Sequence, residues 1–362
     1  NMVHPSNFIS AGDAGIIRKY AAQAEALGQL HTSQLEVIYR RGWFKLLVPD
    51  VYEGLQYTLP QLVRLQEGIS WADGSTGWVV TLCSGAGWFG GFIDPSVARQ
   101  VFSMPHVCLA GSGAASGSAE IVPDGYLING TWNYASGAHH ATHFTANCMI
   151  TKEGKNVLDD QGEALVLPFL VDRECVGLLP TWKYTGMVAT GSHSFKIENL
   201  KVGGLRCFRI DARDAQVNEA LYRYPFLQLA EATLAVNLSG LAIHFTDLCT
   251  SVFEERKKNP RITSPQKLHL DEVLHQCVHR MQTVRNAFYE AVDKSWQKDG
   301  EYTGELAAVS ETSRALARAA RETVDVLYTY CGLKAAATDT ELNRVWRDLH
   351  TAGQHALLTF AC

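Results

Sequence analysis

Apolar side chains recur at helical spacing through the first part of the chain. Leu62, Leu65 and Ile69 are three and four residues apart, which places them on one face of a helix. The stretch from Gly74 to Ile93 then carries no charged side chain over 20 residues, which is also the length of a membrane span. It contains six glycines and has no basic cluster at either end, so we expect a buried helix and no membrane span. Asp94-Pro95 should begin the next helix, because aspartate caps free N–H groups and proline fits the first turn.

The pattern changes to short alternating runs between residues 105 and 211. Pro123-Asp124-Gly125 and Asn129-Gly130 are typical of hairpin turns. Large residues alternate with smaller or polar ones around these turns, which favours β-strands. We therefore predict a compact antiparallel barrel or sandwich. The large residues of this alternation are Tyr126, Ile128, Trp132 and Tyr134.

Helical stripes return from Leu229 to the end of the chain. Three long stripes are followed by a last helix, for which the capping box at residues 338–341 predicts the start. The predicted fold is mainly α with a central β domain. Its parts are an N-terminal helical domain at residues 1–104, a middle β domain at residues 105–212 and a C-terminal four-helix bundle at residues 213–362.

Composition narrows the class of protein. Hydrophobic residues make up 46% of the chain and charged residues 19%, as in ordinary globular proteins. Lys and Arg total 32 against 37 Asp and Glu, for a net charge of −5, so a nucleic-acid groove is not expected. The nine cysteines include no C-x-x-C pair. With no signal-peptide pattern at the start, they indicate reduced core thiols and a cytoplasmic protein.

The last predicted helix carries the first candidate chemistry. On a helical wheel of residues 339–358, Asp348, Thr351 and His355 fall on the side opposite the apolar residues. Periodicity alone favours a solvated polar face. A histidine in this place could instead act as an acid or base near neutral pH.

Five short segments, in the same order along the chain, resemble those of the acyl-CoA dehydrogenase fold. Within that superfamily the chain resembles the oxygenase components of two-component flavin monooxygenases, such as p-hydroxyphenylacetate hydroxylase, the secosteroid phenol hydroxylases and dibenzothiophene monooxygenase. The segments are Val48-Pro49 with Tyr52-Glu53-Gly54, the run from Ala72 to Trp78, the run from Trp132 to Gly137, the run from Thr190 to Phe195, and the run from Arg344 to Asp348.

The resemblance implies an enzyme that uses reduced FMN or FAD, made by a separate flavin reductase, together with O2. Reduced flavin and O2 would form a C4a-hydroperoxide that hydroxylates an aromatic or polycyclic small molecule. Family precedent and the long apolar stripes suggest a homotetramer. Neither a nucleic-acid nor a membrane partner is expected.

The resemblance also implies roles for particular residues. His355 matches the histidine that acts as acid or base, and Ser136 matches the partner of flavin N5. Trp132 would form a wall for the flavin, although a large ring is often a core residue. Arg256 and Gln266 resemble an Arg and Gln pair that reaches the flavin of a neighbouring subunit. The full cofactor-binding set is Ser112, Trp132, Ser136, Thr190, Ser192, Arg256 and Gln266.

Departures from the pattern leave alternatives open. Ala356 stands where many dehydrogenases carry their catalytic Glu, which disfavours an acyl-CoA dehydrogenase without excluding a base elsewhere. Ala86 stands where several phenol hydroxylases carry a histidine, and Val188 and Ala189 replace a common Arg-Gly. The pocket should therefore be less polar. Desaturation, oxygenation of sulfur or nitrogen, and ligand binding without catalysis remain possible alternatives.

A run of histidines suggests a metal site at first sight. His139, His140 and His143 could place two imidazoles on one helix face. The run contains no cysteine or carboxylate ligand, so we predict no metal there.

Overall fold

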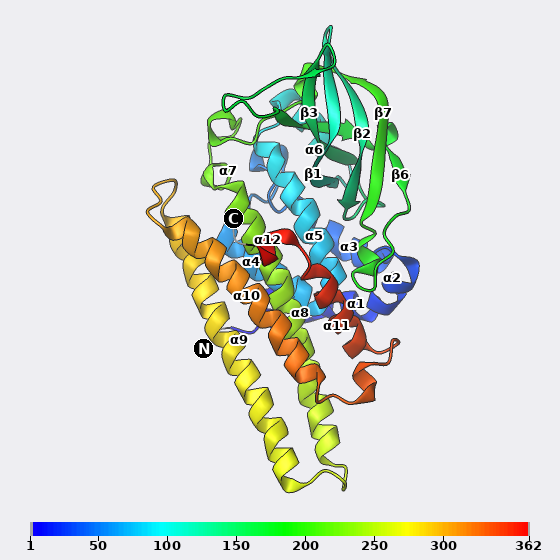
Figure 1. Cartoon of the computed structure of the whole chain (residues 1–362), viewed down its shortest axis with the longest axis vertical. Helices are drawn as coiled ribbons and strands as arrows, with labels where there is room; N and C mark the ends of the chain where they lie inside the picture. The colour runs from blue at the N-terminus through cyan, green and yellow to red at the C-terminus, as the bar shows by residue number, and fades with distance from the viewer. Residues whose placement is uncertain (1–2, 361–362) are drawn as a thin grey trace.

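The computed structural model describes residues 3–360, which form an N-terminal helical part, a β-sheet and a C-terminal helical part (Figure 1). Asp94 caps α6 through its contacts with the N–H groups of Ser96 and Val97, as expected for Asp94-Pro95. The helices of the first part are α1 (Ala11–Lys19), α2 (Ala21–Leu27), α3 (Thr32–Arg41), α4 (Leu59–Ala72), α5 (Gly74–Gly87) and α6 (Pro95–Phe102).

The middle part is one mixed sheet, so the predicted β domain is confirmed, and the all-antiparallel pairing is wrong only for the pair β1 and β3. The strands are β1 (Leu109–Val122), β2 (Gly125–Ala135), β3 (His143–Lys152), β4 (Lys155–Asn156), β5 (Val166–Asp172), β6 (Gly177–Leu179) and β7 (His193–Val202). Their order is β4-β3-β1-β2-β7-β6, with β5 paired to β3. β1 and β3 are parallel, because the chain after β2 crosses to the far side of β1, where Leu109 pairs with His143.

Only one of the two predicted turns joins strands. Val122 pairs with Gly125, so Pro123-Asp124 forms the hairpin turn. Asn129-Gly130 instead lies inside β2, at a shift in the register with β7. A Cβ at Gly130 would lie 2.9 Å from the Trp132 ring, so this glycine makes room for an indole and does not end a strand.

The C-terminal part contains three long antiparallel helices and two shorter ones. They are α8 (Phe226–Lys257), α9 (Ser264–Gln297), α10 (Glu305–Tyr328), α11 (Glu341–Ala352) and α12 (Ala356–Thr359), preceded by the short α7 (Ala220–Arg223). Within residues 3–360, α8 is the one helix long and apolar enough to cross a membrane, and 78% of its most apolar window is buried inside the protein. We therefore regard α8 as the core helix of the bundle (Figure 1).

The last helix is shorter than predicted. It begins after Thr340, whose side chain accepts from the N–H of Asn343, and it ends before Gly353. Glycine has a low helix propensity, and the side chain of His355 accepts from the N–H of Leu357 to begin the separate helix α12. The helical wheel therefore placed His355 on a helix that does not reach it.

A buried ion pair joins three helices beneath the sheet. Glu67 of α4 accepts from Arg285 of α9 at 2.5 and 3.0 Å, and the two side chains are 1% and 5% exposed. Ser239 of α8 also donates to Glu67, at 2.6 Å. The carboxylate is therefore fully hydrogen-bonded, as a buried charge must be.

We expect Arg285→Met to lower the free energy of unfolding by about 3–5 kcal/mol, because it leaves the buried Glu67 carboxylate without its cation. Urea unfolding measures the change. The control is Lys294→Met, which breaks the exposed ion pair of Lys294 with Glu290 and should cost about 0–0.5 kcal/mol. Equal losses in the two variants would contradict this account.

Candidate functional site

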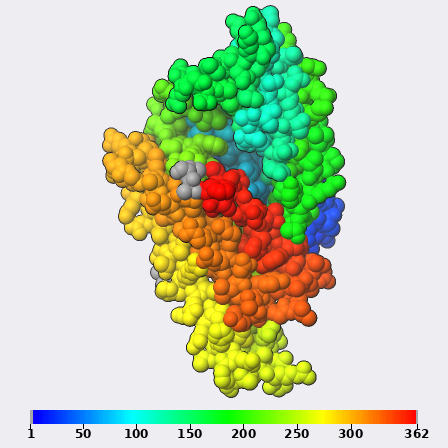
Figure 2. Space-filling model, in the orientation of Figure 1, coloured from blue at the N-terminus to red at the C-terminus, as the bar shows by residue number. Residues whose placement is uncertain are grey.

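A cleft lies where α5, α8, α12 and the sheet meet. α5 contacts both α8 and β1, and α12 contacts α8 and α10. Figure 2 shows the surface hollowed between the sheet and the C-terminal end of the chain, with part of the N-terminal half at the bottom of the hollow. The cleft therefore brings together segments from all three parts of the protein.

Three faces of α5 are packed, and the fourth is open to this cleft. Gly77 faces α4, Thr81 accepts a hydrogen bond from α8, and Cys83 donates to the carbonyl of Ser136 in the turn after β2. At 100° per residue, the remaining stripe falls between the side that faces α8 and the side that faces the sheet. This open stripe of α5 consists of Trp78, Leu82 and Gly85.

A chain of hydroxyl groups leads away from the cleft at Ser136. Nε1 of Trp78 donates to Oγ of Ser136 at 3.2 Å. Oγ of Ser136 is 2.7 Å from Oγ of Ser192, and that atom is 2.7 Å from Oγ1 of Thr190. Oγ1 of Thr190 donates to the carbonyl of Met187 at 2.7 Å. The predicted residues Ser136, Thr190 and Ser192 are therefore brought together.

The hydroxyl of Thr190, at the end of this series of hydroxyl groups, sets the direction of every hydrogen bond in the series. A hydroxyl has one proton, and that of Thr190 is used on the carbonyl of Met187. Ser192 must therefore donate to Thr190, and Ser136 must donate to Ser192. The Ser136 oxygen already accepts from Trp78, so it retains one lone pair. Ser136 is thus oriented as an acceptor for an N–H group of a ligand.

The ring centre of His355 lies 6.1 Å from that of Trp78. The N–H of Leu357 donates to Nδ1 of His355 at 3.2 Å. This hydrogen bond assigns the proton of the neutral ring to Nε2. Burial lowers the pKa of His355, so at neutral pH the ring is uncharged and its Nε2–H is a donor.

Asp348 does not share a surface with His355, contrary to the helical-wheel prediction. Its side chain is 2% exposed and accepts from the backbone N–H of Met187 at 2.7 Å. Burial, together with the nearby charge of Asp73, raises the pKa of Asp348 to about 8. Asp348 therefore ties α11 to the segment that carries Thr190.

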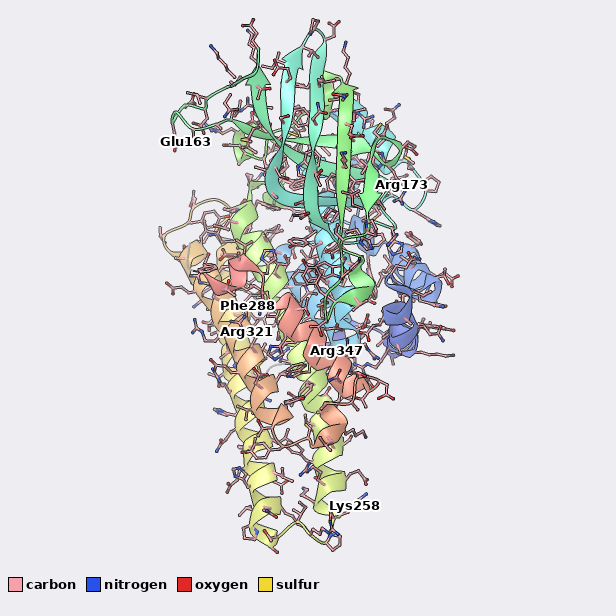
Figure 3. The ribbon with its side chains drawn as sticks, turned by 45° about the vertical axis from the view of Figure 1, so that its right-hand side comes forward. Glu163, Arg173, Lys258, Phe288, Arg321 and Arg347 are labelled. Atoms are coloured by element: carbon pink, nitrogen blue, oxygen red, sulfur yellow. The ribbon has the colours of Figure 1, made fainter. Side chains whose placement is uncertain are left out.

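A second set of contacts holds the same segment against α11. Arg347 pairs with Glu25 of α2 at 2.9 Å and donates to the carbonyl of Thr185 at 2.9 Å; Figure 3 labels Arg347 on this face. A Cβ at Gly186 would lie 2.1 Å from the carbonyl oxygen of Arg347. Only glycine permits so close an approach.

Trp132 is a core residue, and the prediction that it forms a flavin wall is wrong. It is fully buried, its ring stacks on Phe195 at 5.1 Å, and Nε1 donates to the carbonyl of Asn147. The aromatic ring that contacts the cleft is Trp78, which the sequence prediction missed. Its position directly after Gly77, in the uncharged helix, was the available signal.

The remaining predicted cofactor residues make local contacts in this chain. Oγ of Ser112 accepts from the N–H of Ala114 on β1. Gln266 shares a capping box with Thr263 at the start of α9, and Arg256 lies in the last turn of α8. Figure 3 shows that end of the bundle, at Lys258, far from the sheet. Arg256 and Gln266 therefore lie at the end of the bundle away from the sheet.

The three histidines of the β2–β3 crossover lie in different surroundings. His139 is exposed, whereas His143 is buried and lies 3.4 Å from the carboxylate of Asp172. Burial lowers the pKa of His140 to about 4. Within residues 3–360, no group of three His, Cys, Asp or Glu residues is arranged to hold a metal ion.

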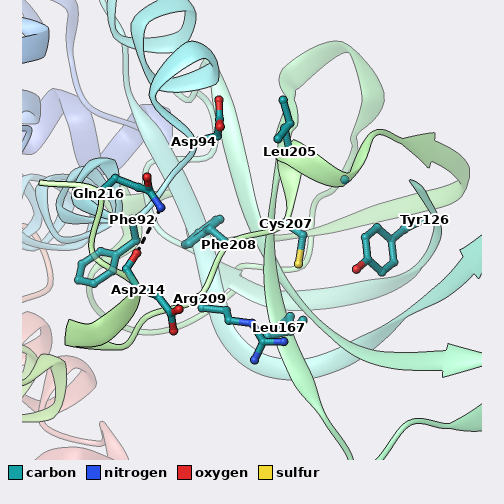
Figure 4. Close-up of a pocket in the computed structure, with 11 residues that line it drawn as sticks. Phe92, Asp94, Tyr126, Leu167, Leu205, Cys207, Phe208, Arg209, Asp214 and Gln216 are labelled. Carbon is teal, nitrogen blue, oxygen red and sulfur yellow. Dashed lines mark hydrogen bonds between the residues drawn. The ribbon is translucent and has the colours of Figure 1, made fainter. Parts of the chain in front are cut away.

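A cavity of about 340 Å³ lies between the sheet and the chain that leads to α7, and Figure 4 shows its lining. Asp94, Arg209 and Asp214 give this cavity charged walls. It contains none of the predicted site residues. The cleft at Ser136 and His355 therefore remains the candidate site.

Comparison with known sequences finds one matching family and similar monooxygenases. Residues 226–360 match the family described as acyl-CoA dehydrogenase, C-terminal domain. The chain is 26% identical to indole-3-acetate monooxygenase of Pseudomonas putida, over 94% of this chain and 88% of that protein. It is 25% identical to the oxygenase subunit HsaA, a flavin-dependent monooxygenase of Rhodococcus jostii, over 94% and 91%.

Solved structures share the fold. The 3-HSA hydroxylase of Rhodococcus sp. RHA1 superimposes with a TM-score of 0.88 at 20% identity, over 96% of this chain and 91% of that one. XiaF of Streptomyces sp., solved with FADH2 and glycerol, superimposes with a TM-score of 0.82 at 21% identity, over 96% and 89%. The arrangement of helices and sheet is thus that of the acyl-CoA dehydrogenase fold.

Asp348 makes the stability of the protein depend on pH. In the folded protein its pKa is about 8, above the ordinary value of 3.8, so the folded state holds a proton that the unfolded state loses. Stability should therefore fall as pH rises from about 4 to about 8. We expect Asp348→Asn, which keeps an acceptor for Met187, to remove this fall.

Urea unfolding at pH 5 and pH 8 measures the effect. The wild type should lose at least about 1 kcal/mol more than Asp348→Asn between these values. Parallel losses in the two proteins would show that Asp348 is ionised in the folded state.

Proposed function

We propose that this chain, which has the acyl-CoA dehydrogenase fold, is the oxygenase component of a two-component flavin-dependent monooxygenase acting on an aromatic small molecule. The observation that carries the proposal is one cleft in which a hydrogen-bond acceptor at Ser136 and a donor at His355 both lie beside Trp78. The similarity to two monooxygenases over nearly the whole chain supports it.

Reduced FMN or FAD, delivered by a separate flavin reductase, would supply the electrons that activate O2 in this cleft. The N5–H of a reduced flavin is a donor, so it suits the free lone pair of Ser136. We further propose a cytoplasmic homotetramer, in which Arg256 and Gln266 of one copy reach the flavin of another. The distance of both residues from their own cleft supports this arrangement.

Ser136 would retain the proton at N5. An acceptor at that atom would favour transfer of oxygen to the substrate over its loss as hydrogen peroxide. Because Ser136 donates to Ser192, its oxygen cannot also donate to the flavin. Thr190 and Ser192 are positioning residues that keep Ser136 an acceptor.

His355 would donate from Nε2 to an oxygen of the substrate or to the oxygen being transferred. Its Nδ1 is occupied by the N–H of Leu357, so the neutral ring favours the donor role over that of a base. Its ring centre lies 6.1 Å from that of Trp78, and Trp78 donates to Ser136.

The dehydrogenase alternative lacks a carboxylate to remove a proton next to a carbonyl group. Position 356 is alanine, and no Asp or Glu follows Asp348 in the sequence. Asp348 is engaged by Met187, and Asp73 accepts from Thr76 as the cap of α5. Oxygenation of sulfur or nitrogen would not require a donor at position 355, so variants of His355 distinguish it from ring hydroxylation.

Rapid mixing of the protein, loaded with reduced FMN or FAD, against oxygenated buffer tests the proposal. We expect a transient absorbance phase before oxidised flavin appears. In Ser136→Ala this phase should decay roughly tenfold faster, with more hydrogen peroxide released, because a hydrogen bond worth about 1.4 kcal/mol is lost.

Ser194→Ala is the matched control. Ser194 is also buried, but its hydroxyl donates to Asn133 outside the chain of hydroxyls. This variant should decay at the wild-type rate. Direct oxidation of the flavin in the wild type, with no earlier phase, would refute the proposed function.

We expect His355→Asn to slow the hydroxylation of 2-naphthol in a single turnover by about 10²–10⁴. Asparagine still caps α12, so this variant removes the imidazole donor and keeps the fold. The rate at which loaded reduced flavin reacts with O2 should change little. Unchanged product formation would exclude a role for His355 in ring hydroxylation.

A further inference from the structure

Two cysteines of the C-terminal bundle have their sulfur atoms in contact. Cys249 lies on α8, and Cys331 lies in the segment between α10 and α11, residues 329–340. Both are free thiols, and their Sγ atoms are 3.4 Å apart. A disulfide bond is about 2.05 Å long, so each sulfur would need to move by less than about 1 Å. The two side chains are therefore close enough to form one.

Hydrogen bonds give the two sulfurs different roles. Cys331 donates its proton to the carbonyl of Leu327 at 3.2 Å. A thiol has one proton, so Cys249 must be the donor and Cys331 the acceptor where the two sulfurs meet. A hydrogen bond accepted in this way stabilises the negative charge of a thiolate. Cys331 is thus the sulfur that ionises, and Cys249 keeps its proton.

A positive charge lies beside Cys331. A Cβ at Gly332 would lie 2.4 Å from Nη1 of Arg256, so the guanidinium packs against the backbone of the next residue. Nε of Arg256 is buried and has no hydrogen-bond partner within residues 3–360. The hydrogen bond from Cys249 and the charge of Arg256 lower the pKa of the Cys331 thiol, against the opposing effect of burial. The thiolate is the form of cysteine that attacks peroxides.

Cys331 lies close to the surface of the protein. It is itself 3% exposed, but Leu333 is 89% exposed, and Gly332 between them is exposed as well. The segment consists of turns and one short helix, Leu333–Ala335, so it opens locally at a lower cost than the long helices do. A molecule as small as hydrogen peroxide can therefore reach the sulfur.

Cys83 and Cys108 form a second close pair, in different surroundings. They are 0% and 1% exposed, and Cys83 donates to the carbonyl of Ser136 between α5 and the sheet. Burial raises the pKa of the Cys108 thiol well above its ordinary value. Thiols buried in this way are inert, so this pair should stay reduced and serves as an internal control.

We propose that Cys249 and Cys331 are an oxidation site, at which hydrogen peroxide converts the two thiols to a disulfide that links α8 to the segment before α11. The Cys331 thiolate attacks one oxygen of the peroxide. An S–O bond forms, the O–O bond breaks, and the hydroxide that leaves takes up the proton that Cys331 lost.

The second step closes the cross-link. Cys249 gives up its proton and attacks the sulfur of Cys331, so that an S–S bond forms, the S–O bond breaks and the hydroxide leaves with that proton as water. The two thiols together lose two electrons, which reduce one peroxide to two waters. A reducing compartment returns the pair to thiols, so the cross-link is reversible.

The inference rests on the proposed function only for the source of the oxidant, because a monooxygenase that loses activated oxygen releases hydrogen peroxide beside its own chain. Treatment of the whole protein with added hydrogen peroxide, with neither flavin nor substrate present, therefore tests the site independently of the proposed activity. The remaining thiols are alkylated under denaturing conditions, and the digested peptides are identified by mass spectrometry.

We expect a peptide that links Cys249 to Cys331 and that dithiothreitol separates, with Cys83 and Cys108 recovered in alkylated form. Absence of the linked peptide would overturn the proposal. An equally rapid loss of the Cys83 and Cys108 thiols would also overturn it, because the surroundings of Cys331 would then have no effect.

Serine variants separate the roles of the two sulfurs. In Cys249→Ser the linked peptide should be lost, and Cys331 should accumulate as the sulfenic acid, which dimedone captures. In Cys331→Ser the thiol of Cys249 should be recovered in alkylated form. Capture of a sulfenic acid at Cys249 in that variant would overturn the role assigned to Cys331.

Arg256→Gln tests the charge beside the pair. It should slow the loss of the two thiols by at least about threefold, because a smaller fraction of Cys331 is ionised near neutral pH. Lys258→Gln is the matched control, because Lys258 lies two residues further along the chain but is paired with Glu255 on the surface. This control should react at the wild-type rate. An unchanged rate in Arg256→Gln would overturn the role of Arg256.

Discussion

The close packing of α5 on three sides is the constraint on which the rest of the structure depends. Gly77 brings α5 against α4, Gly74 brings it against α8, and a Cβ at Gly137 would lie 2.7 Å from the Cys83 sulfur. An uncharged helix is required, because no water reaches these contacts. The fourth side is then the only one on which a ligand can lie, and its residues become the floor of the cleft.

The segment from Gly186 to Ser192 positions the hydroxyl groups that lead away from the cleft. Gly186 and Met187 are held by the backbone of Arg347 and the carboxylate of Asp348. The carbonyl of Met187 then receives the last hydrogen bond of the chain that begins at Ser136. Contacts of α11 in the bundle thus determine which way the hydroxyl of Ser136, in the turn after β2, points, although the two are far apart in the sequence.

Periodicity correctly predicted the structural features that depend on residues close together in the sequence. The order of helical, β and helical parts, the start of α6 at Asp94-Pro95 and the buried character of α5 all follow from local patterns. The position of Trp132 does not follow from a local pattern, because alternation cannot tell whether an aromatic ring lies in the core or in the cleft. Its place is decided by Gly117, fifteen residues away, where a Cβ would lie 1.9 Å from the indole. The parallel pairing of β1 and β3 likewise depends on a crossover that no local pattern reports.

The position of His355 shows why a mistaken local prediction can still select a residue of the candidate site. The wheel treated it as a member of a continuous helix, whereas the chain breaks at Gly353 and His355 caps a new one. The cap has a chemical consequence that a helical position would lack. By accepting the N–H of Leu357, Nδ1 leaves the ring proton on Nε2, and burial keeps the ring neutral. A residue inside a helix would be free to adopt either tautomer, so the break at Gly353 is what makes His355 a donor of defined direction.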